Sequence, residues 1–245
     1  IPTSGTTSLK LKIAVIKKSC FLNAARGANS FLNSTEYDSW LAALPFHHVS
    51  GLSILARAFL KKNKIYSLDK WNAGEFVNQL AQSQISFSSL VPTQIFDIIQ
   101  NNLKAPATLK TDLVGGSALT DHQFNTMIQL GWPVVKTFGM TETSAFFSVA
   151  NSDSSYKPLP RVDVSVDTQG HLAIRCDSLF DGYIKQMDTR WAFEPKVLNN
   201  KFWSTDDRAV LISNNENQKI FKILGRDHSL IKIKSEFVNL NLLSN

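Results

Sequence analysis

The first 150 residues alternate between strand-like and helix-like segments, and this alternation constrains the fold more than any other feature of the chain. Short runs of strand-forming residues are followed by longer stretches with the apolar periodicity of helices. Repeated alternation of this kind is typical of a mostly parallel sheet covered by helices. We therefore expect strands at 12–16, 40–44, 64–68, 85–91, 109–114 and 133–138, with helices at 21–32, 52–60, 73–82, 92–101 and 121–130.

The pattern changes after residue 152. A polar segment at 151–155 precedes short alternating runs at 162–166, 171–175, 209–213 and 219–224, which turn-forming residues separate. Such runs indicate antiparallel strands. We predict an α/β fold: a mostly parallel sheet flanked by helices, followed by a small antiparallel β-subdomain. Its parts are expected to be a core at 1–152, the β-rich subdomain at 153–226, and at 227–245 a hinge that begins a C-terminal domain which this chain lacks.

Composition narrows the classes of protein to consider. The chain has 245 residues, of which 43% are hydrophobic and 19% charged, so it can bury a sizeable core. No apolar run approaches the roughly 20 residues of a membrane-spanning helix, so no membrane insertion is expected. Cys20 and Cys176 lie far apart without metal-like spacing, which favours reduced thiols in a cytoplasmic protein. The net charge of +6 suits an anionic ligand, but the chain lacks the aromatic and basic patch of a nucleic-acid binder.

A loop of small and hydroxyl-bearing residues opens the chain, and two lysines follow it. The backbone N–H groups of such a loop can wrap anionic oxygens, and a lysine can neutralise their charge. Solvated turns have the same composition, so this segment alone leaves phosphate binding and a simple turn equally open. The candidate phosphate ligands are Thr3, Ser4, Gly5, Thr6, Thr7, Ser8 and either Lys10 or Lys12.

Three further loops with unusual residues follow predicted strands, at 45–51, 115–119 and 138–143. The carboxyl ends of parallel strands meet at one edge of a sheet, so we expect the three loops to lie together. An aromatic ring can stack on a base, a threonine hydroxyl can contact a phosphate, and a glutamate can hold magnesium. Each loop alone has a structural explanation, since Gly-Gly often forms a turn and Thr-Glu often caps a helix. Together they favour a nucleotide site.

Six segments, taken in order, resemble the adenylate-forming enzymes, which include acyl-CoA synthetases, firefly luciferase and the adenylation domains of peptide synthetases. The segments are TSGTTS, LPFHHVSGL, VGGSAL, TFGMTET, FWSTDD and ILGRDHSLIKIKSE, and they extend from Thr3 to Glu236. Within this superfamily, residues 48–57 are similar to the o-succinylbenzoate–CoA ligase family of menaquinone biosynthesis.

The resemblance implies a two-step reaction that depends on ATP. A carboxylate attacks the α-phosphorus of ATP to give an acyl adenylate and pyrophosphate, and the thiol of CoA then displaces AMP. The implied cofactors are ATP, Mg²⁺ and CoA, and the implied substrate is a small-molecule carboxylic acid, o-succinylbenzoate. The resemblance implies no nucleic-acid partner and leaves a homodimer open.

The resemblance also assigns roles to individual residues. Thr141 would contact the α-phosphate, Glu142 would ligate magnesium, and His48 would lie at the mouth of the acyl pocket; with Lys12 these are the expected catalytic residues. Arg57 would pair with a substrate carboxylate, because a planar guanidinium pairs bidentately with it; the alternative is a solvated helix arginine. Phe138 would stack on adenine, and Gly116 and Ser117 would line the adenine and acyl pockets. Asp207 and Arg226 would hold the ribose. The other implied contacts are Gly139 for the cofactor and Ser50, Gly51 and Gly115 for the substrate.

Departures from the family pattern leave alternatives open. The lysine of the phosphate loop is displaced by about one residue, and alignment on the following helix favours Lys12 over Lys10. Asp206 adds a second carboxylate beside Asp207, and His228 and Ser229 stand where the family has its hinge carboxylate. The alternatives are a non-catalytic relative that binds a nucleotide or acyl ligand, and a ligase for another carboxylic acid.

Overall fold

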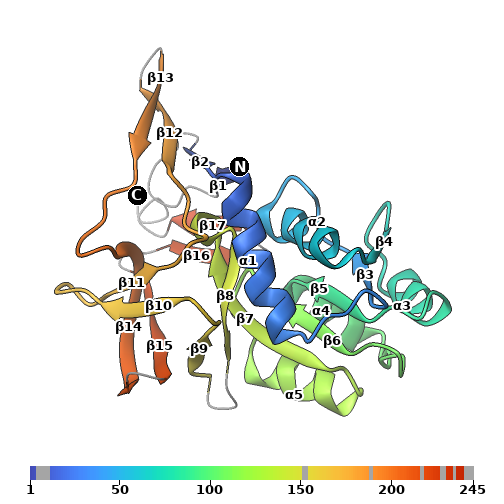
Figure 1. The fold of residues 1–245 in the computed structure, drawn as a ribbon. Helices are drawn as coiled ribbons and strands as arrows, with labels where there is room; N and C mark the ends of the chain where they lie inside the picture. Colours follow the sequence, from blue (N-terminus) through green and yellow to red (C-terminus); the bar gives the residue numbers. More distant parts are fainter. Residues whose placement is uncertain are drawn as a thin grey trace.

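The computed structural model describes residues 1–3, 12–150, 154–187, 190–215, 218–226, 230–233 and 236–239. A central sheet begins with five strands that pair in parallel, with β3 between β4 and β5, and with β6 and β7 following on the side of β5 (Figure 1). The parallel pairing predicted from the alternating pattern is confirmed. These strands are β3 (Ser39–Ala42), β4 (Lys64–Ser67), β5 (Phe87–Leu90), β6 (Thr111–Val114) and β7 (Val134–Met140).

The same sheet continues through six antiparallel strands. They are β8 (Ala145–Ala150), β9 (Tyr156–Pro158), β10 (Asp163–Val166), β11 (His171–Arg175), β14 (Trp203–Asn215) and β15 (Gln218–Arg226). The strand order is β10-β11-β14-β15-β9-β8-β7-β6-β5-β3-β4, so eleven strands share one hydrogen-bonded sheet. The predicted antiparallel strands therefore extend the main sheet, and β8 and β9 make the join. The division of the chain at 152 stays a prediction, and 151–153 lie outside the described residues.

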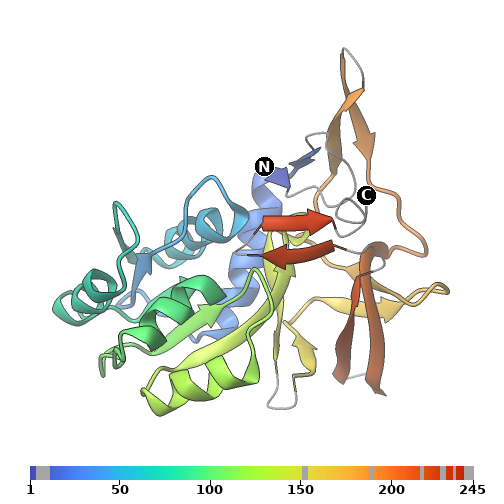
Figure 2. The same cartoon turned by 180° about the vertical axis from the view of Figure 1, so that it is seen from behind.

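Two small antiparallel sheets complete the strands. One has the order β1-β2-β12-β13, and the other pairs β16 with β17, as Figures 1 and 2 show. The segment at 12–16 was expected to begin the parallel alternation, but β2 instead pairs with β1 and β12 outside the main sheet. The strands are β1 (Pro2–Thr3), β2 (Lys12–Val15), β12 (Gly182–Met187), β13 (Arg190–Pro195), β16 (Leu230–Ile233) and β17 (Glu236–Asn239).

Helices cover both faces of the parallel part of the sheet. They are α1 (Lys18–Phe31), α2 (Val49–Lys61), α3 (Ala73–Gln82), α4 (Pro92–Gln100) and α5 (Asp121–Gln129), with a short 3₁₀ helix η1 (Thr141–Thr143) after β7. Local chemistry fixes several starts: the side chain of Asn72 caps α3, Pro92 opens α4, and Thr120 forms a capping box with Gln123 on α5. Within the described residues, no helix is long and apolar enough to cross a membrane.

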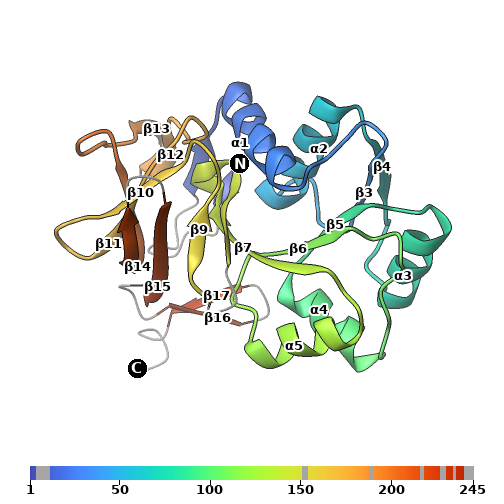
Figure 3. The same cartoon turned by 60° about the horizontal axis from the view of Figure 1, so that its bottom comes forward.

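The sheet separates two apolar layers, and a third lies under the antiparallel strands. Helices α1 and α2 pack on one face through Trp40, Phe87 and Leu113, while α3, α4 and α5 pack on the other face through Leu41, Leu90 and Val114 (Figure 3). Alternate residues of each strand thus serve opposite layers. The third layer joins Phe147 of β8 to Phe221 of β15 and to residues of β10 and β11.

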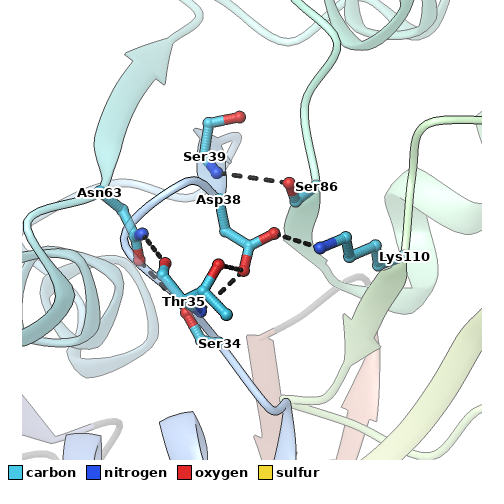
Figure 4. A network of polar contacts seen from close by, with 7 residues as sticks. All are labelled: Ser34, Thr35, Asp38, Ser39, Asn63, Ser86 and Lys110. Atoms are coloured by element: carbon cyan, nitrogen blue, oxygen red, sulfur yellow. Dashed lines mark hydrogen bonds and ion pairs between the residues drawn. The ribbon is translucent and has the colours of Figure 1, made fainter.

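A polar network joins the starts of three parallel strands, at the edge where β3, β5 and β6 begin (Figure 4). The Asp38 carboxylate accepts hydrogen bonds from the backbone and hydroxyl of Thr35, and Lys110 approaches it to 2.6 Å. Ser86 accepts a hydrogen bond from the backbone of Ser39. The network ties the loops before these strands together, and it lies at the edge opposite their carboxyl ends.

Candidate functional site

The carboxyl ends of the parallel strands bring three predicted loops to one edge of the sheet. The turn with His48 follows β3, the Gly115–Gly116 turn follows β6, and η1 with Thr141 and Glu142 follows β7. Ligands bind at this edge in open α/β sheets. The spatial grouping inferred from the sequence is therefore present, and the roles of the individual residues stay predictions.

The double glycine has a backbone reason at each position. Gly116 has φ +84°, in the left-handed region that favours glycine, and a Cβ there would lie 3.3 Å from Val91 Cγ1. A Cβ on Gly115 would lie 2.6 Å from Oγ1 of Thr137, which belongs to the neighbouring strand β7. Ser117 is exposed beyond this turn. Without side chains at these two positions, a flat base could approach the backbone of the turn closely.

The strand β7 carries Phe138 and Gly139 into the site. A Cβ on Gly139 would lie 2.2 Å from the Cα of Phe146, so this glycine permits the close pairing of β7 with β8. The ring of Phe138 is half-buried and packs against the rings of Phe147, Tyr156 and Phe221, with centroid separations of 5.5, 5.4 and 6.1 Å. Three aromatic rings thus hold the Phe138 side chain in place, and its stacking on adenine stays a prediction.

Glu142 is fixed by one contact with the segment before β12 and one with β12 itself. Its carbonyl accepts a hydrogen bond of 2.8 Å from the backbone N–H of Phe180, and its Oε1 accepts one of 2.6 Å from the hydroxyl of Tyr183. Burial, followed by the charge and hydrogen bond of Glu142, raises the pKa of Tyr183 far above its usual range. The phenol therefore stays protonated and remains a donor to the carboxylate.

Lys12 faces the same group. Its Nζ lies 4.1 Å from the centroid of the Tyr183 ring, and Lys185 lies 5.7 Å from it. Thr3 pairs with Lys12 across β1 and β2, so the ends of the predicted phosphate loop meet beside Tyr183. Lys12 is the candidate lysine that the described residues include, and the choice between Lys12 and Lys10 stays a prediction. The other loop candidates, Ser4, Gly5, Thr6, Thr7, Ser8 and Lys10, lie outside the described residues.

The two predicted ribose ligands form an ion pair. Arg226 donates to Asp207 from Nε at 2.6 Å and from a terminal nitrogen at 3.3 Å, across the paired strands β14 and β15. Burial lowers the pKa of Arg226, but Asp207, and then Asp206 and Glu142, outweigh burial and raise it. The charge of Glu142, in η1, contributes to the raised pKa of Arg226. The Asp207–Arg226 pair therefore lies within electrostatic reach of the Glu142 carboxylate.

Arg57 lies in the layer beneath α2 and is not a solvated helix residue. It is 3% exposed, and its guanidinium carbon lies 4.9 Å from the centroid of Phe146 and 5.2 Å from that of Trp40. One terminal nitrogen donates to Ser53, whereas Nε and the other terminal nitrogen have no hydrogen-bond partner in the described part of the chain. Burial lowers the pKa of Arg57 to about 9. Two buried donors on a cation are thus available to an anion.

The turn before α2 places the remaining substrate candidates. His48 precedes the first residue of α2, and its exposed ring lies 4.3 Å from that of His47, between centroids. The carbonyl of Ser50 accepts a hydrogen bond from Ser53, the residue that Arg57 contacts. A Cβ on Gly51 would lie 2.2 Å from the carbonyl oxygen of Pro45, so close packing of α2 on its own turn already accounts for this glycine.

The residues present fit a magnesium ion held jointly with a nucleotide. Among the described residues, no group of three or more His, Cys, Asp or Glu side chains could hold a metal ion. Mg²⁺ is commonly bound by one or two carboxylates plus substrate phosphates, so a single well-placed Glu142 suits that mode. Lys12 beside it would supply positive charge to the same phosphates.

The sequence analysis missed Tyr183, the residue that links two of its candidates. Tyr183 lies in β12, whose pairing with β2 connects the start of the chain to a strand far along it. The signal in the sequence is only an isolated Gly182-Tyr183 pair after a turn, and no local pattern predicts the partner of such a strand. The structure therefore brings Lys12, Tyr183 and Glu142 together, with the Asp207–Arg226 pair in electrostatic reach of Glu142. Arg57 packs separately, against Phe146 of β8.

Comparisons with known proteins identify the family and the fold of this chain. A 2-succinylbenzoate–CoA ligase from Staphylococcus aureus (strain JH9) is 30% identical over 221 residues, which cover 85% of this chain and 44% of that protein. A double mutant of o-succinylbenzoate CoA synthetase from Bacillus subtilis, bound to a product analogue, superposes with a TM-score of 0.82 at 21% identity over 100% of this chain and 53% of that one. The same enzyme with ATP and magnesium gives 0.80 at 22% identity, over 100% and 54%.

The chain thus spans less than half the length of the curated relative, and the likeness to the solved structures concerns the fold. The family model described as AMP-binding enzyme matches residues 1–184, which include the predicted phosphate loop, the double glycine, η1 and the first part of β12. The chain belongs to the AMP-binding enzyme family.

Proposed function

We propose that this chain is the nucleotide- and acid-binding part of an acid–thiol ligase that forms an acyl adenylate and then an acyl-CoA. The proposed acid is o-succinylbenzoate, the substrate named in the relatives, and the cofactors are ATP, Mg²⁺ and CoA. The proposed location is the cytoplasm, and the proposed pathway is menaquinone biosynthesis. Cys20 and Cys176 are free thiols, as this location requires.

One observation carries the choice of acid. A buried cation costs free energy unless it is paired, and two of the three guanidinium nitrogens of Arg57 have no hydrogen-bond partner among the described residues, while the third donates to a serine. A substrate carboxylate would supply that partner to a cation whose Nε and one terminal nitrogen have none among the described residues. A dicarboxylic acid could use one carboxylate here while the other is activated, which suits o-succinylbenzoate better than a fatty acid.

The other half of the site supports use of a nucleotide. Lys12 would contact the terminal phosphates, Thr141 the α-phosphate, and Glu142 would hold magnesium. Asp207 and Arg226 would hold the ribose, with Phe138, Gly116 and Ser117 around the base. When bound, magnesium would neutralise phosphate charge. The side chains themselves position the acid and ATP, which is the main source of rate when no enzyme nucleophile takes part.

Calorimetric titration of the 245-residue chain tests the choice of acid. o-Succinylbenzoate should bind to the chain in the presence of MgATP, and Arg57→Ala should weaken it at least tenfold. Arg26→Ala, at an exposed arginine of α1, is the matched control and should leave binding unchanged. A matched monocarboxylate that lacks the non-reacting carboxylate should bind weakly to both proteins.

Two outcomes would contradict parts of the proposal. Tight binding of a monocarboxylate that is unaffected by Arg57→Ala would indicate a ligase for another acid. Binding of ATP and acid without o-succinylbenzoate-dependent release of pyrophosphate, also in a version extended to the length of the relatives, would indicate a non-catalytic member. Asp206 beside the nucleotide site is the residue that favours this second candidate.

A further inference from the structure

Tyr183 touches both the cationic and the anionic residue of the candidate nucleotide site. We propose that Tyr183 is a positioning residue, which holds the Glu142 carboxylate in the orientation that receives the magnesium ion of the nucleotide and sets its distance from Lys12. This inference rests on the proposed function and deepens it, because it assigns a role to a residue outside the six segments from which the site was predicted.

The backbone of Tyr183 is fixed from both sides. In β12 it lies opposite Ala14 of β2 and opposite Glu194 of β13, so ladder hydrogen bonds hold it in the middle of a sheet. Its ring packs on the buried ring of Phe180, with centroids 4.7 Å apart. A ring held in this way has little freedom to move, so its hydroxyl is a fixed reference point for whatever it contacts.

The hydroxyl orders a side chain that would otherwise be mobile. Glutamate loses more rotamer freedom on ordering than most residues, and a site that binds metal through it must supply that cost. The 2.6 Å bond from Tyr183 to Oε1 limits the rotation of the carboxylate before any ligand arrives. Oε2 has no hydrogen-bond partner in the described part of the chain, so one oxygen is anchored and the other is available to a cation.

The ring also places the positive charge. Lys12 lies over its face at 4.1 Å, where an aromatic quadrupole attracts an ammonium group. Lys12 also lies directly opposite Lys185 across β2 and β12, a repulsive arrangement that Lys185 relieves by pairing with Glu194. The tyrosine thus stands between the Lys12 ammonium and the Glu142 carboxylate, the two groups that would act on one set of phosphates.

A purely structural tyrosine would behave differently from a positioning one. Loss of a structural hydroxyl would lower stability and weaken every ligand alike. Loss of a positioning hydroxyl would act on the magnesium complex alone, because only that complex uses the orientation of Glu142. Tyr183→Phe removes the hydroxyl and keeps the ring under Lys12, so it separates the two cases.

The test uses the 245-residue chain and measures binding, independent of turnover. Calorimetry would give the Kd for MgATP and for ATP in EDTA, and electron paramagnetic resonance would give the Kd for Mn²⁺ with ATP bound. Tyr183→Phe should weaken MgATP and Mn²⁺ about fivefold to tenfold, the effect of about 1 kcal/mol for one hydrogen bond, and leave metal-free ATP unchanged. Tyr37→Phe, at a tyrosine that is 90% exposed, is the matched control and should change neither.

The double mutant with Glu142→Gln completes the test. In the Glu142→Gln background, Tyr183→Phe should have no further effect on MgATP, since the orientation of a carboxylate no longer matters. Equal weakening of MgATP and metal-free ATP, or full additivity with Glu142→Gln, would overturn the role of Tyr183 and leave the proposed function intact. A parent chain that binds no MgATP would overturn both.

Discussion

Lys110 lies 2.6 Å from Asp38, and this ion pair joins the residue before β6 to the residue before β3 across the intervening strand β5. The Asp38 side chain is 1% exposed, whereas that of Lys110 is 58% exposed. The carboxylate is therefore the buried member, and the hydrogen bonds of Thr35 complete its shell. The pair fixes the starts of strands whose opposite ends carry the candidate site.

Removal of the Asp38 carboxylate should destabilise the whole fold. Asp38→Ala leaves the N–H of Thr35 without its acceptor and should lower the free energy of unfolding by about 2 to 3 kcal/mol. Asp121→Ala is the control, because Asp121 also pairs with a lysine but is 82% exposed, and it should cost less than about 1 kcal/mol. Urea unfolding measures both, and equal losses would contradict the argument.

Asp38 should also contribute to acid sensitivity. Burial alone would raise its pKa, but hydrogen bonds from Lys110, Thr35 and Ser86 outweigh burial and lower it. A carboxyl with a lowered pKa in the folded state stabilises above its unfolded pKa of about 3.9 and loses that contribution as pH falls. The Asp38→Asn variant should therefore lose less stability than the parent chain between roughly pH 5 and pH 3, the window in which the carboxyl takes up its proton. Urea unfolding at each pH measures the two slopes. An identical slope in the two proteins would exclude this role.

Substrate affinity should depend on pH through Arg57. Its pKa of about 9 means that the guanidinium is charged at neutral pH and loses its proton as pH rises through that value. Only the charged form pairs with a carboxylate, so the affinity for o-succinylbenzoate should be constant at neutral pH and fall above about pH 9. Calorimetry across this range measures the profile. The Arg57→Ala variant should show no such decline.

Gly116 should be needed for nucleotide binding as well as for stability, whereas Gly131, which has a similar backbone conformation, should be needed for stability alone. Gly116 and Gly131 have φ of +84° and +83°, but a Cβ on Gly131 would meet nothing within 4 Å. Each change to alanine should cost about 1 to 2 kcal/mol of stability through backbone strain. Only Gly116→Ala should also weaken ATP binding, since Gly131 precedes β7 at the opposite edge. Equal ATP affinity in both variants would contradict a nucleotide role for Gly116.

Removal of the extra carboxylate at position 206 should favour the nucleotide. Asp206 is exposed and its charge acts on Arg226, within the candidate ribose site. Asp206→Asn should tighten ATP about threefold to tenfold, as expected when a repulsion of about 1 kcal/mol is removed. Asp207→Asn is the contrasting variant and should weaken ATP, because it breaks the pair with Arg226. Fluorescence titration at low salt measures both changes.

The sequence predicted the helical part of this fold closely because its signals are local. Pro92 and the caps at Asn72 and Thr120 define helix starts without reference to distant residues. The parallel order followed from the alternation of elements. The pairing of β2 with β12 could not be predicted, because hydrogen bonds between strands depend on segments that only the complete fold brings together.

The candidate site shows the same division. Thr141, Glu142 and the double glycine were identified because each follows a predicted strand, where parallel topology gathers ligands. Tyr183 was missed because its importance comes from one contact with Glu142 and one with Lys12, both across elements. The burial of Arg57 could not be predicted from the sequence either. An arginine in an amphipathic helix has the same local pattern whether its side chain faces water or the sheet.

The passage from β7 through η1 to β8 has a consequence for exchanging parts between related proteins. At this turn the strand pairing of the sheet changes from parallel to antiparallel, and the same turn carries Thr141 and Glu142. A recombination point between β7 and β8 would take the two paired strands, and the site residues between them, from different parents. Chimeras that inherit both strands from one parent should fold and bind nucleotide, whereas crossovers inside the turn should impair both folding and nucleotide binding.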